Sequence, residues 1–201
     1  MSDPKQHELA GHLSVVTGHG RLTKLLVETP WSTAEIYLHG AHVTDFRKTG
    51  EAPLLFMSAA SEFAPGKPIR VGIPIIFPWF GPREGFPAHG FARTTEWHLV
   101  GATRSVEGAV TLFLSLPESD GLHVSYEVTV AETLRLVLRV ANPTSTPFTF
   151  EDCLHTYFQV GQVESISLTG LGGTACIDKV FGTNSVELSA ALVIDREVDR
   201  I

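Results

Sequence analysis

Short runs of apolar residues, many of them alternating with polar ones and closed by turn residues, recur along the whole chain. The alternation is clearest in TLRLVLRVANP, where Leu134, Leu136, Leu138 and Val140 face one side of an extended strand and the arginines between them face the other. Runs of this length, rich in Val, Thr and aromatic residues, with turns every ~8–12 residues, are typical of an all-β sandwich or barrel. The expected strands lie within residues 12–18, 20–30, 31–50, 53–58, 96–105, 109–117, 123–132, 133–143, 148–161, 163–171 and 174–181.

We expect these strands to pair antiparallel, because the sequence offers no helical periodicity for the crossover helices that parallel strands require. No Gly/Ser linker or low-complexity tract divides the chain, so a single domain over residues 1–201 is predicted. The last residues, SAALVIDREVDRI, resemble the beginning of a further element. We therefore expect a β-sandwich that lacks its last strands.

Composition narrows the class of protein. The chain is 43% hydrophobic and 18% charged, which favours a folded globular domain. Its formal net charge of −7 disfavours nucleic acid and anionic membranes as partners, although two arginines would suffice for a local anion site. The two cysteines form no C-x-x-C pair, no apolar run reaches ~18 residues, and the start lacks a basic region followed by an apolar run. A cytoplasmic location is expected.

The segment RVGIPIIFPWFGPREGFPAHGFAR, residues 70–93, combines many prolines and glycines with core-type apolar residues and an arginine at each end. If its end is extended, His89, Phe91 and Arg93 share one face, and Gly90 lets a ligand or backbone approach closely. One interpretation is a rigid pocket wall whose shape proline and glycine fix. The other is an Ω-like loop whose aromatic side chains plug a sheet opening, with Arg93 in a surface ion pair.

The segment FTFEDCLHTYFQV carries a second candidate site. On a strand, Glu151, Cys153, His155 and Tyr157 point to the same side. A carboxylate and a phenol on the face of a histidine can orient it or favour its charged form. A histidine among apolar neighbours is nevertheless more often a structural residue than a catalytic one, and this alternative stays open here.

Two further motifs carry weaker signals. In CIDKVF, Asp178 and Lys179 point to opposite faces of an apolar strand, so one of them should point inward and needs a partner. In LHGAH, the spacing of His39 and His42 suggests a metal site at first sight. On strand geometry, however, their side chains point to opposite faces, and no third ligand with metal-like spacing follows. We expect no metal site.

Four motifs in order, RVGIPIIFPWFG, PAHGFARTTEW, FEDCLHTYF and CIDKVF, resemble those of the hexose-6-phosphate mutarotases. These glucose-6-phosphate 1-epimerases are a branch of the aldose 1-epimerase family. The resemblance covers residues 20–201 and implies the galactose-mutarotase-like fold, a large antiparallel β-supersandwich. It also implies an isomerase that interconverts the α and β anomers of a hexose 6-phosphate by acid/base ring opening and closure.

The resemblance assigns roles to individual residues. His155 matches the catalytic histidine, the general acid that protonates the ring oxygen. His89 matches the pocket histidine that contacts the sugar, and Arg70 and Arg93 match the arginines associated with the phosphate. Asp178 matches a carboxylate that binds sugar hydroxyls.

The resemblance implies no cofactor and no metal, and a small-molecule hexose 6-phosphate as the partner. The sequence differs from the family pattern at Ala88, where some members carry a polar residue, so one substrate contact is expected to be missing. The family's catalytic glutamate lies in strands expected after EVDRI, and neither Glu187 nor Glu197 matches it. A non-catalytic sugar-phosphate-binding sandwich is therefore the alternative function, and a structural sandwich that mediates protein contacts is a third.

Overall fold

The computed structural model describes residues 3–118 and 121–201, apart from the side chains of residues 183–186. Two compact units make up the chain, unit 1 over Met1–Gln159 and unit 2 over Val160–Ile201. The single domain predicted over residues 1–201 stays a prediction.

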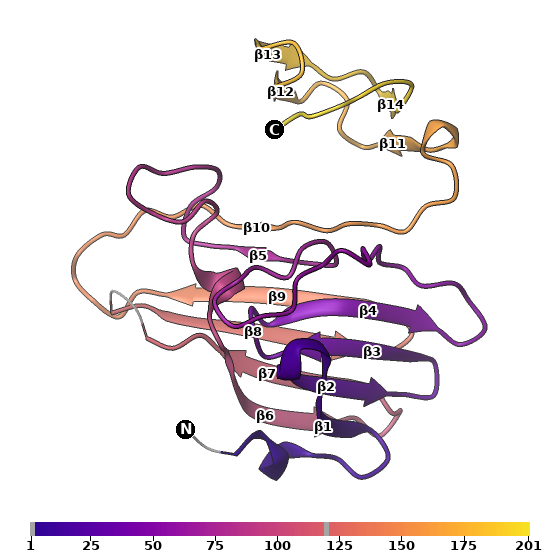
Figure 1. Ribbon diagram of the computed structural model, residues 1–201, viewed down its shortest axis with the longest axis vertical. Helices are drawn as coiled ribbons and strands as arrows, with labels where there is room; N and C mark the ends of the chain where they lie inside the picture. The colour runs from indigo at the N-terminus through magenta and orange to yellow at the C-terminus, as the bar shows by residue number, and fades with distance from the viewer. Residues whose placement is uncertain (1–2, 119–120) are drawn as a thin grey trace. The chain divides into compact units, whose positions relative to one another are not determined.

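Two four-stranded antiparallel sheets form most of unit 1, one in the order β1-β2-β3-β4 and the other in the order β6-β7-β8-β9 (Figure 1). All strand neighbours in both sheets are also neighbours in sequence, as expected of strands joined by short turns. The strands are β1 Leu13–Thr17, β2 Thr23–Glu28, β3 Ser32–Tyr37, β4 His42–Lys48, β6 His98–Arg104, β7 Val110–Ser115, β8 His123–Val130 and β9 Leu134–Ala141. Short 3-10 helices lie at η1 Pro4–His7, η2 His19–Arg21 and η3 Ala92–Thr94.

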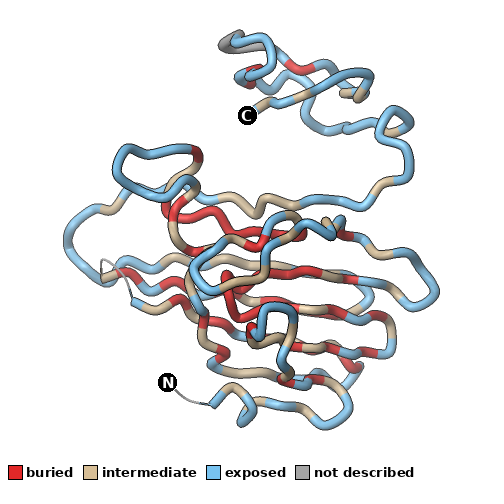
Figure 2. The backbone as a smooth tube through the Cα atoms, viewed as in Figure 1, coloured by how far each residue is buried: buried red, intermediate tan, exposed pale blue. Residues whose placement is uncertain are grey.

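The core of unit 1 draws apolar side chains from both sheets, and Figure 2 shows buried residues recurring along their strands. Leu25 in β2, Ile36 in β3 and Val128 in β8 are fully buried members of this core. The alternation predicted for β9 is confirmed. Leu134, Leu136, Leu138 and Val140 pack against the core, whereas the two arginines of β9 pair with Glu127 on the other face.

Two of the strand predictions in unit 1 were not confirmed in full. Residues 53–58 form no strand. The predicted strand within residues 148–161 is reduced to β10, Cys153–Leu154, which pairs with β5, Ile75–Ile76, in the register Cys153↔Ile76. On both sides of β10 the backbone bonds keep this antiparallel register, since the N–H groups of Glu151, His155 and Tyr157 donate to Pro78 O, Pro74 O and Gly72 O.

Unit 2 consists of two small antiparallel pairs. They are formed by β11 Ser167–Thr169 with β14 Ala191–Val193 and by β12 Ala175–Asp178 with β13 Thr183–Glu187, after η4 Val163–Ser165. Most of the described residues of unit 2 are exposed. None of the helices in the described ranges is long and apolar enough to cross a membrane.

Candidate functional site

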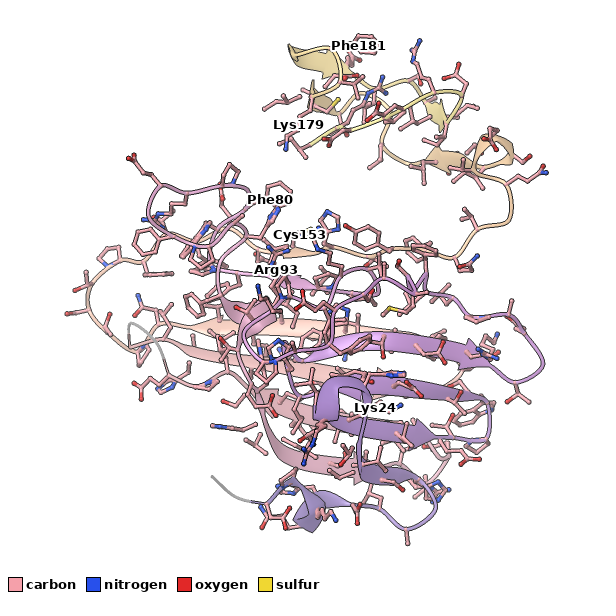
Figure 3. All side chains as sticks on the ribbon, in the orientation of Figure 1. Lys24, Phe80, Arg93, Cys153, Lys179 and Phe181 are labelled. Carbon is pink, nitrogen blue, oxygen red and sulfur yellow. The ribbon has the colours of Figure 1, made fainter. Side chains whose placement is uncertain are left out.

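The short β5–β10 pair brings the two motif segments of unit 1 together. The backbone N–H of His155, just after β10, donates to Pro74 O at 3.1 Å, just before β5. The imidazole of His155 lies 4.9 Å from the Tyr157 ring and 6.5 Å, nearly parallel, from the Phe80 ring, between centroids. In Figure 3, Phe80 is labelled in the same region of unit 1 as Arg93. His155 is thus a half-buried residue beside two aromatic rings and not a residue of the apolar core.

The second predicted histidine packs against the same aromatic ring. Phe80 meets the ring of His89 edge-on, with centroids 5.0 Å apart. The Gly81 N–H donates to His89 Nδ1 at 3.1 Å, and the His89 N–H donates to Gly81 O at 2.8 Å. Because Nδ1 accepts this bond, a neutral imidazole carries its proton on Nε2. The structure therefore brings His89 and His155 next to the same phenylalanine ring.

The extended conformation, on which the predicted shared face of His89, Phe91 and Arg93 depended, is not found. His89 has φ 68° and Gly90 has φ 70°, and Ala92–Thr94 is the 3-10 helix η3, so the segment is not extended. Alternation therefore does not apply. Proximity of His89 and Arg93 arises from a turn, in which Arg93 Nη2 donates to Ala88 O at 2.8 Å.

The charge of Arg70 lies close enough to Arg93 to affect the pKa of Arg93. Partial burial and then the neighbouring Arg70 charge lower the pKa of Arg93, which the Tyr157 hydroxyl partly offsets. A guanidinium keeps its charge even so. Within the described part of the chain, neither arginine has a carboxylate partner, and the buried Nε of Arg93 has no hydrogen-bond partner. Two adjacent cations without a carboxylate create a local preference for an anion.

The carboxylate of Glu151 has a partner other than the expected histidine. Its Oε2 accepts from the Phe80 N–H at 2.8 Å, which ties the 148–160 segment to the loop after β5. A groove of about 330 Å³ lies beside this contact, lined by Trp79, Phe80, Arg83 and Phe150 among others. The sequence gives no sign of this linking role of Glu151, because nothing in a strand pattern signals a side-chain bond to the backbone of a residue 71 positions away.

Asp178, the predicted sugar-binding carboxylate, is in unit 2 and is described only within it. It is buried, whereas Lys179 is exposed, as the prediction of one inward side chain required. Its Oδ2 accepts from Arg200 Nε at 2.9 Å, and its Oδ1 accepts from the Phe181 N–H at 3.2 Å. The bond from Arg200 lowers the pKa of Asp178. Both carboxylate oxygens are thus engaged inside unit 2, and a role in sugar binding stays a prediction.

His39 and His42 do not point to opposite sides of a strand, contrary to the prediction. His39 precedes a turn in which Gly40 and Ala41 both have positive φ, so strand alternation fails. Both buried rings reach the segment before β5, with His39 Nε2 2.7 Å from Lys67 O and His42 Nε2 2.7 Å from Val71 O. No group of three or more potential metal ligands is found among the described residues.

Burial of His42 has a consequence for stability. Removal from water lowers its pKa from 6.5 to about 4. At a pH between these two pKa values, the unfolded chain therefore binds a proton at His42 that the folded chain does not bind. The free energy of unfolding should fall by up to about 3 kcal/mol as the pH drops through this range.

In urea unfolding at about pH 7 and about pH 4.5, His42→Gln should lose much of this pH dependence. His123→Gln, at an exposed position, should keep it. Equal pH dependence in all three proteins would contradict the prediction.

A larger groove of unit 1, about 670 Å³, is lined by none of the predicted site residues. Tyr37, Phe63, Asp45 and Arg47 are among its lining residues. Size alone therefore does not identify the site, and the two predicted histidines of unit 1 lie elsewhere, beside Phe80.

Comparison with known proteins agrees with the fold. The sequence pattern of the Aldose 1-epimerase family matches residues 24–199. A protein from Escherichia coli (strain K12) named "Putative glucose-6-phosphate 1-epimerase" is 34% identical over 164 residues, which cover 79% of this chain and 55% of that protein. A Cenchrus ciliaris protein of the same name is 30% identical over 185 residues, covering 84% and 56%. The crystal structure of YeaD from Salmonella typhimurium, called a "putative mutarotase", superposes with a TM-score of 0.86 at 29% identity, covering 96% of this chain and 67% of that one.

The chain belongs to the aldose 1-epimerase family. The expected all-β, galactose-mutarotase-like fold is confirmed, since the described strands pair antiparallel and the structure superposes on YeaD. The chain spans about half the length of the curated relatives it matches.

Proposed function

We propose that this protein is a glucose-6-phosphate 1-epimerase, which binds a hexose 6-phosphate and interconverts its α and β anomers. The observation that carries the proposal is a pair of arginines without carboxylate partners among the described residues, Arg70 and Arg93, whose charges interact. Arg93 also interacts with Tyr157, whose ring lies 4.9 Å from that of His155. Family membership and the names of the relatives support the same reaction class.

The arginines suit a phosphate because a guanidinium binds it through paired N–H donors and stays charged at any working pH. A phosphate between Arg70 and Arg93 would relieve the repulsion between the two cations. The chain as a whole carries a net charge of −7, so the two arginines form a local cationic region within an anionic protein. This region would select the phosphate end of the substrate.

The reaction needs an acid at the ring oxygen and a base at the anomeric hydroxyl. We assign the acid to His155, whose ring is half-buried and lies next to aromatic side chains on which the apolar face of a sugar could stack. His89, next to the same Phe80 ring, would contact the sugar, as the family resemblance implies. The resemblance assigns no base to a residue of this sequence.

The test is the anomer exchange of freshly dissolved α-glucose 6-phosphate, followed by NMR or optical rotation. Exchange faster than in buffer alone would support the epimerase. Binding without acceleration would support the alternative of a non-catalytic sugar-phosphate-binding protein, which the lack of an assigned base favours. Neither binding nor acceleration would reject both functions.

Removing either arginine should reduce discrimination in favour of the phosphorylated sugar. Arg70→Ala and Arg93→Ala are each expected to lower the ratio of affinities for glucose 6-phosphate over glucose by about tenfold or more, since each loses a charge-assisted contact. Dissociation constants from NMR titrations give this ratio. Arg104→Ala, at an exposed position of β6, is the matched control and should leave it unchanged. A ratio unaffected by the first two variants would refute the phosphate role.

A further inference from the structure

We infer that His42 is a positioning residue for phosphate recognition: its imidazole fixes the backbone that carries Arg70 and thereby the place of the guanidinium. This rests on the proposed function, because it concerns an arginine that would bind the phosphate. His42 itself lies in β4 and is completely buried.

Hydrogen bonds from other segments of unit 1 to backbone carbonyl groups hold the backbone around Arg70 in place. We define the Arg70 loop as residues 67–72. Four of its six carbonyl oxygens accept a hydrogen bond from a residue elsewhere in unit 1. These are Lys67 O from His39 Nε2 at 2.7 Å, Arg70 O from Ser61 Oγ at 3.0 Å, Val71 O from His42 Nε2 at 2.7 Å, and Gly72 O from the Tyr157 N–H at 2.9 Å.

His42 bonds the loop where its conformation is least favourable. Val71 has φ 64°, a left-handed conformation that a β-branched residue rarely adopts. The next residue, Gly72, has φ 61°, and a Cβ there would lie 2.8 Å from His42 Nε2. The imidazole thus packs directly against the strained turn. Such a conformation persists only where surrounding contacts hold it.

The chemistry of the His42 ring fits this role. A carbonyl oxygen only accepts, so Nε2 carries the proton donated to Val71 O. Nδ1 is then a buried acceptor without a partner among the described residues, which is unfavourable. An apolar side chain would fill the space without this cost, so what the imidazole adds is the bond to Val71.

Arg70 needs such support because its own side chain is exposed and lies near another cation. A long, flexible arginine would move away from Arg93 unless its backbone were fixed. Buried Ile69 anchors the loop on one side of Arg70, and the His42 bond fixes the residue on the other side. Loss of that bond should therefore weaken phosphate binding more than sugar binding.

The experiment measures affinities of the full chain for glucose 6-phosphate and for glucose by NMR titration. The variants are His42→Leu, which removes the donor, His42→Gln, whose amide can still donate, and Ser61→Ala, which removes the bond to Arg70 O. Each is made alone, and His42→Leu and Ser61→Ala are also combined with Arg70→Ala. Ser61 is only partly buried, so Ser61→Ala provides a test even if His42→Leu does not fold.

We expect His42→Leu, or Ser61→Ala if the former does not fold, to lower the affinity ratio by about threefold to tenfold, as loss of one hydrogen bond near the binding group predicts. His42→Gln should retain most of the ratio, and neither change should lower it further once Arg70 is Ala. Equal losses for both sugars, or an unchanged ratio while Arg70→Ala lowers it, would overturn the inference alone. An unchanged ratio in Arg70→Ala itself would instead overturn the phosphate role in the proposed function, and the inference with it.

Discussion

Replacement of His155 by glutamine is expected to slow the anomer exchange of glucose 6-phosphate by about 10²–10⁴-fold, the usual contribution of a general acid. Glutamine keeps a similar size and a hydrogen-bonding amide but cannot deliver a proton to the ring oxygen. Affinity for the sugar phosphate should change little, because the phosphate would be bound by Arg70 and Arg93. NMR exchange spectroscopy measures the rate, and titration with the same substrate measures the affinity.

His98→Gln is the matched control, since His98 is also half-buried in unit 1 but lies in β6, outside the proposed site. It should leave the rate unchanged. An equal loss of rate in both variants would indicate a general effect on the fold. Full activity of His155→Gln, with unaltered binding, would remove His155 from the mechanism.

Replacement of Gly90 by alanine is expected to destabilise unit 1 by more than about 4 kcal/mol, or to prevent folding. Losses of this size are exceptional and require a severe disruption, here a steric conflict. A Cβ on Gly90 would lie 1.9 Å from Phe77 O and 2.7 Å from Pro78 N, both of them backbone atoms. The same Phe77 carbonyl accepts the N–H groups of Phe91 and Ala92, so it cannot move without loss of both bonds. Thermal or urea unfolding measures the change.

Gly85→Ala is the control for Gly90→Ala. Gly85 also has positive φ, 75°, but nothing lies within 4 Å of an added Cβ. Only the backbone strain of an L-residue, about 1–2 kcal/mol, should appear there. A similar small loss for both variants would show that the close approach of Gly90 to Phe77 is not essential to the fold.

The fold class could be predicted because alternation is a local property. Side chains of a pleated strand point to opposite faces in turn, so Leu134 and Arg135 reveal a half-buried strand without knowledge of its partners. The same reasoning failed where the backbone leaves the extended region. Positive φ at Gly40, Ala41 and His89 reverses the chain direction, and the sequence near these residues does not give the resulting side-chain directions.

The candidate site could be predicted in its residue types but not in its contacts. The order of the motifs pointed to Arg70, His89, Arg93 and His155 through the family resemblance. Contacts such as that between Glu151 and Phe80 join residues 71 positions apart, and local sequence carries no record of them. Glu151 was expected to orient the histidine, but in the structure it binds backbone.

The sequence by itself determined that this protein is an antiparallel β-sandwich, because strand periodicity is a property of neighbouring residues, and its ordered motifs resemble those of the aldose 1-epimerase family. Only the tertiary structure decided that the charge of Arg70 acts on Arg93, and that buried His42 donates a hydrogen bond to the Arg70 loop. The physical reason is that these arrangements depend on hydrogen bonds and packing between distant segments, whose loop conformations are fixed by the surrounding fold.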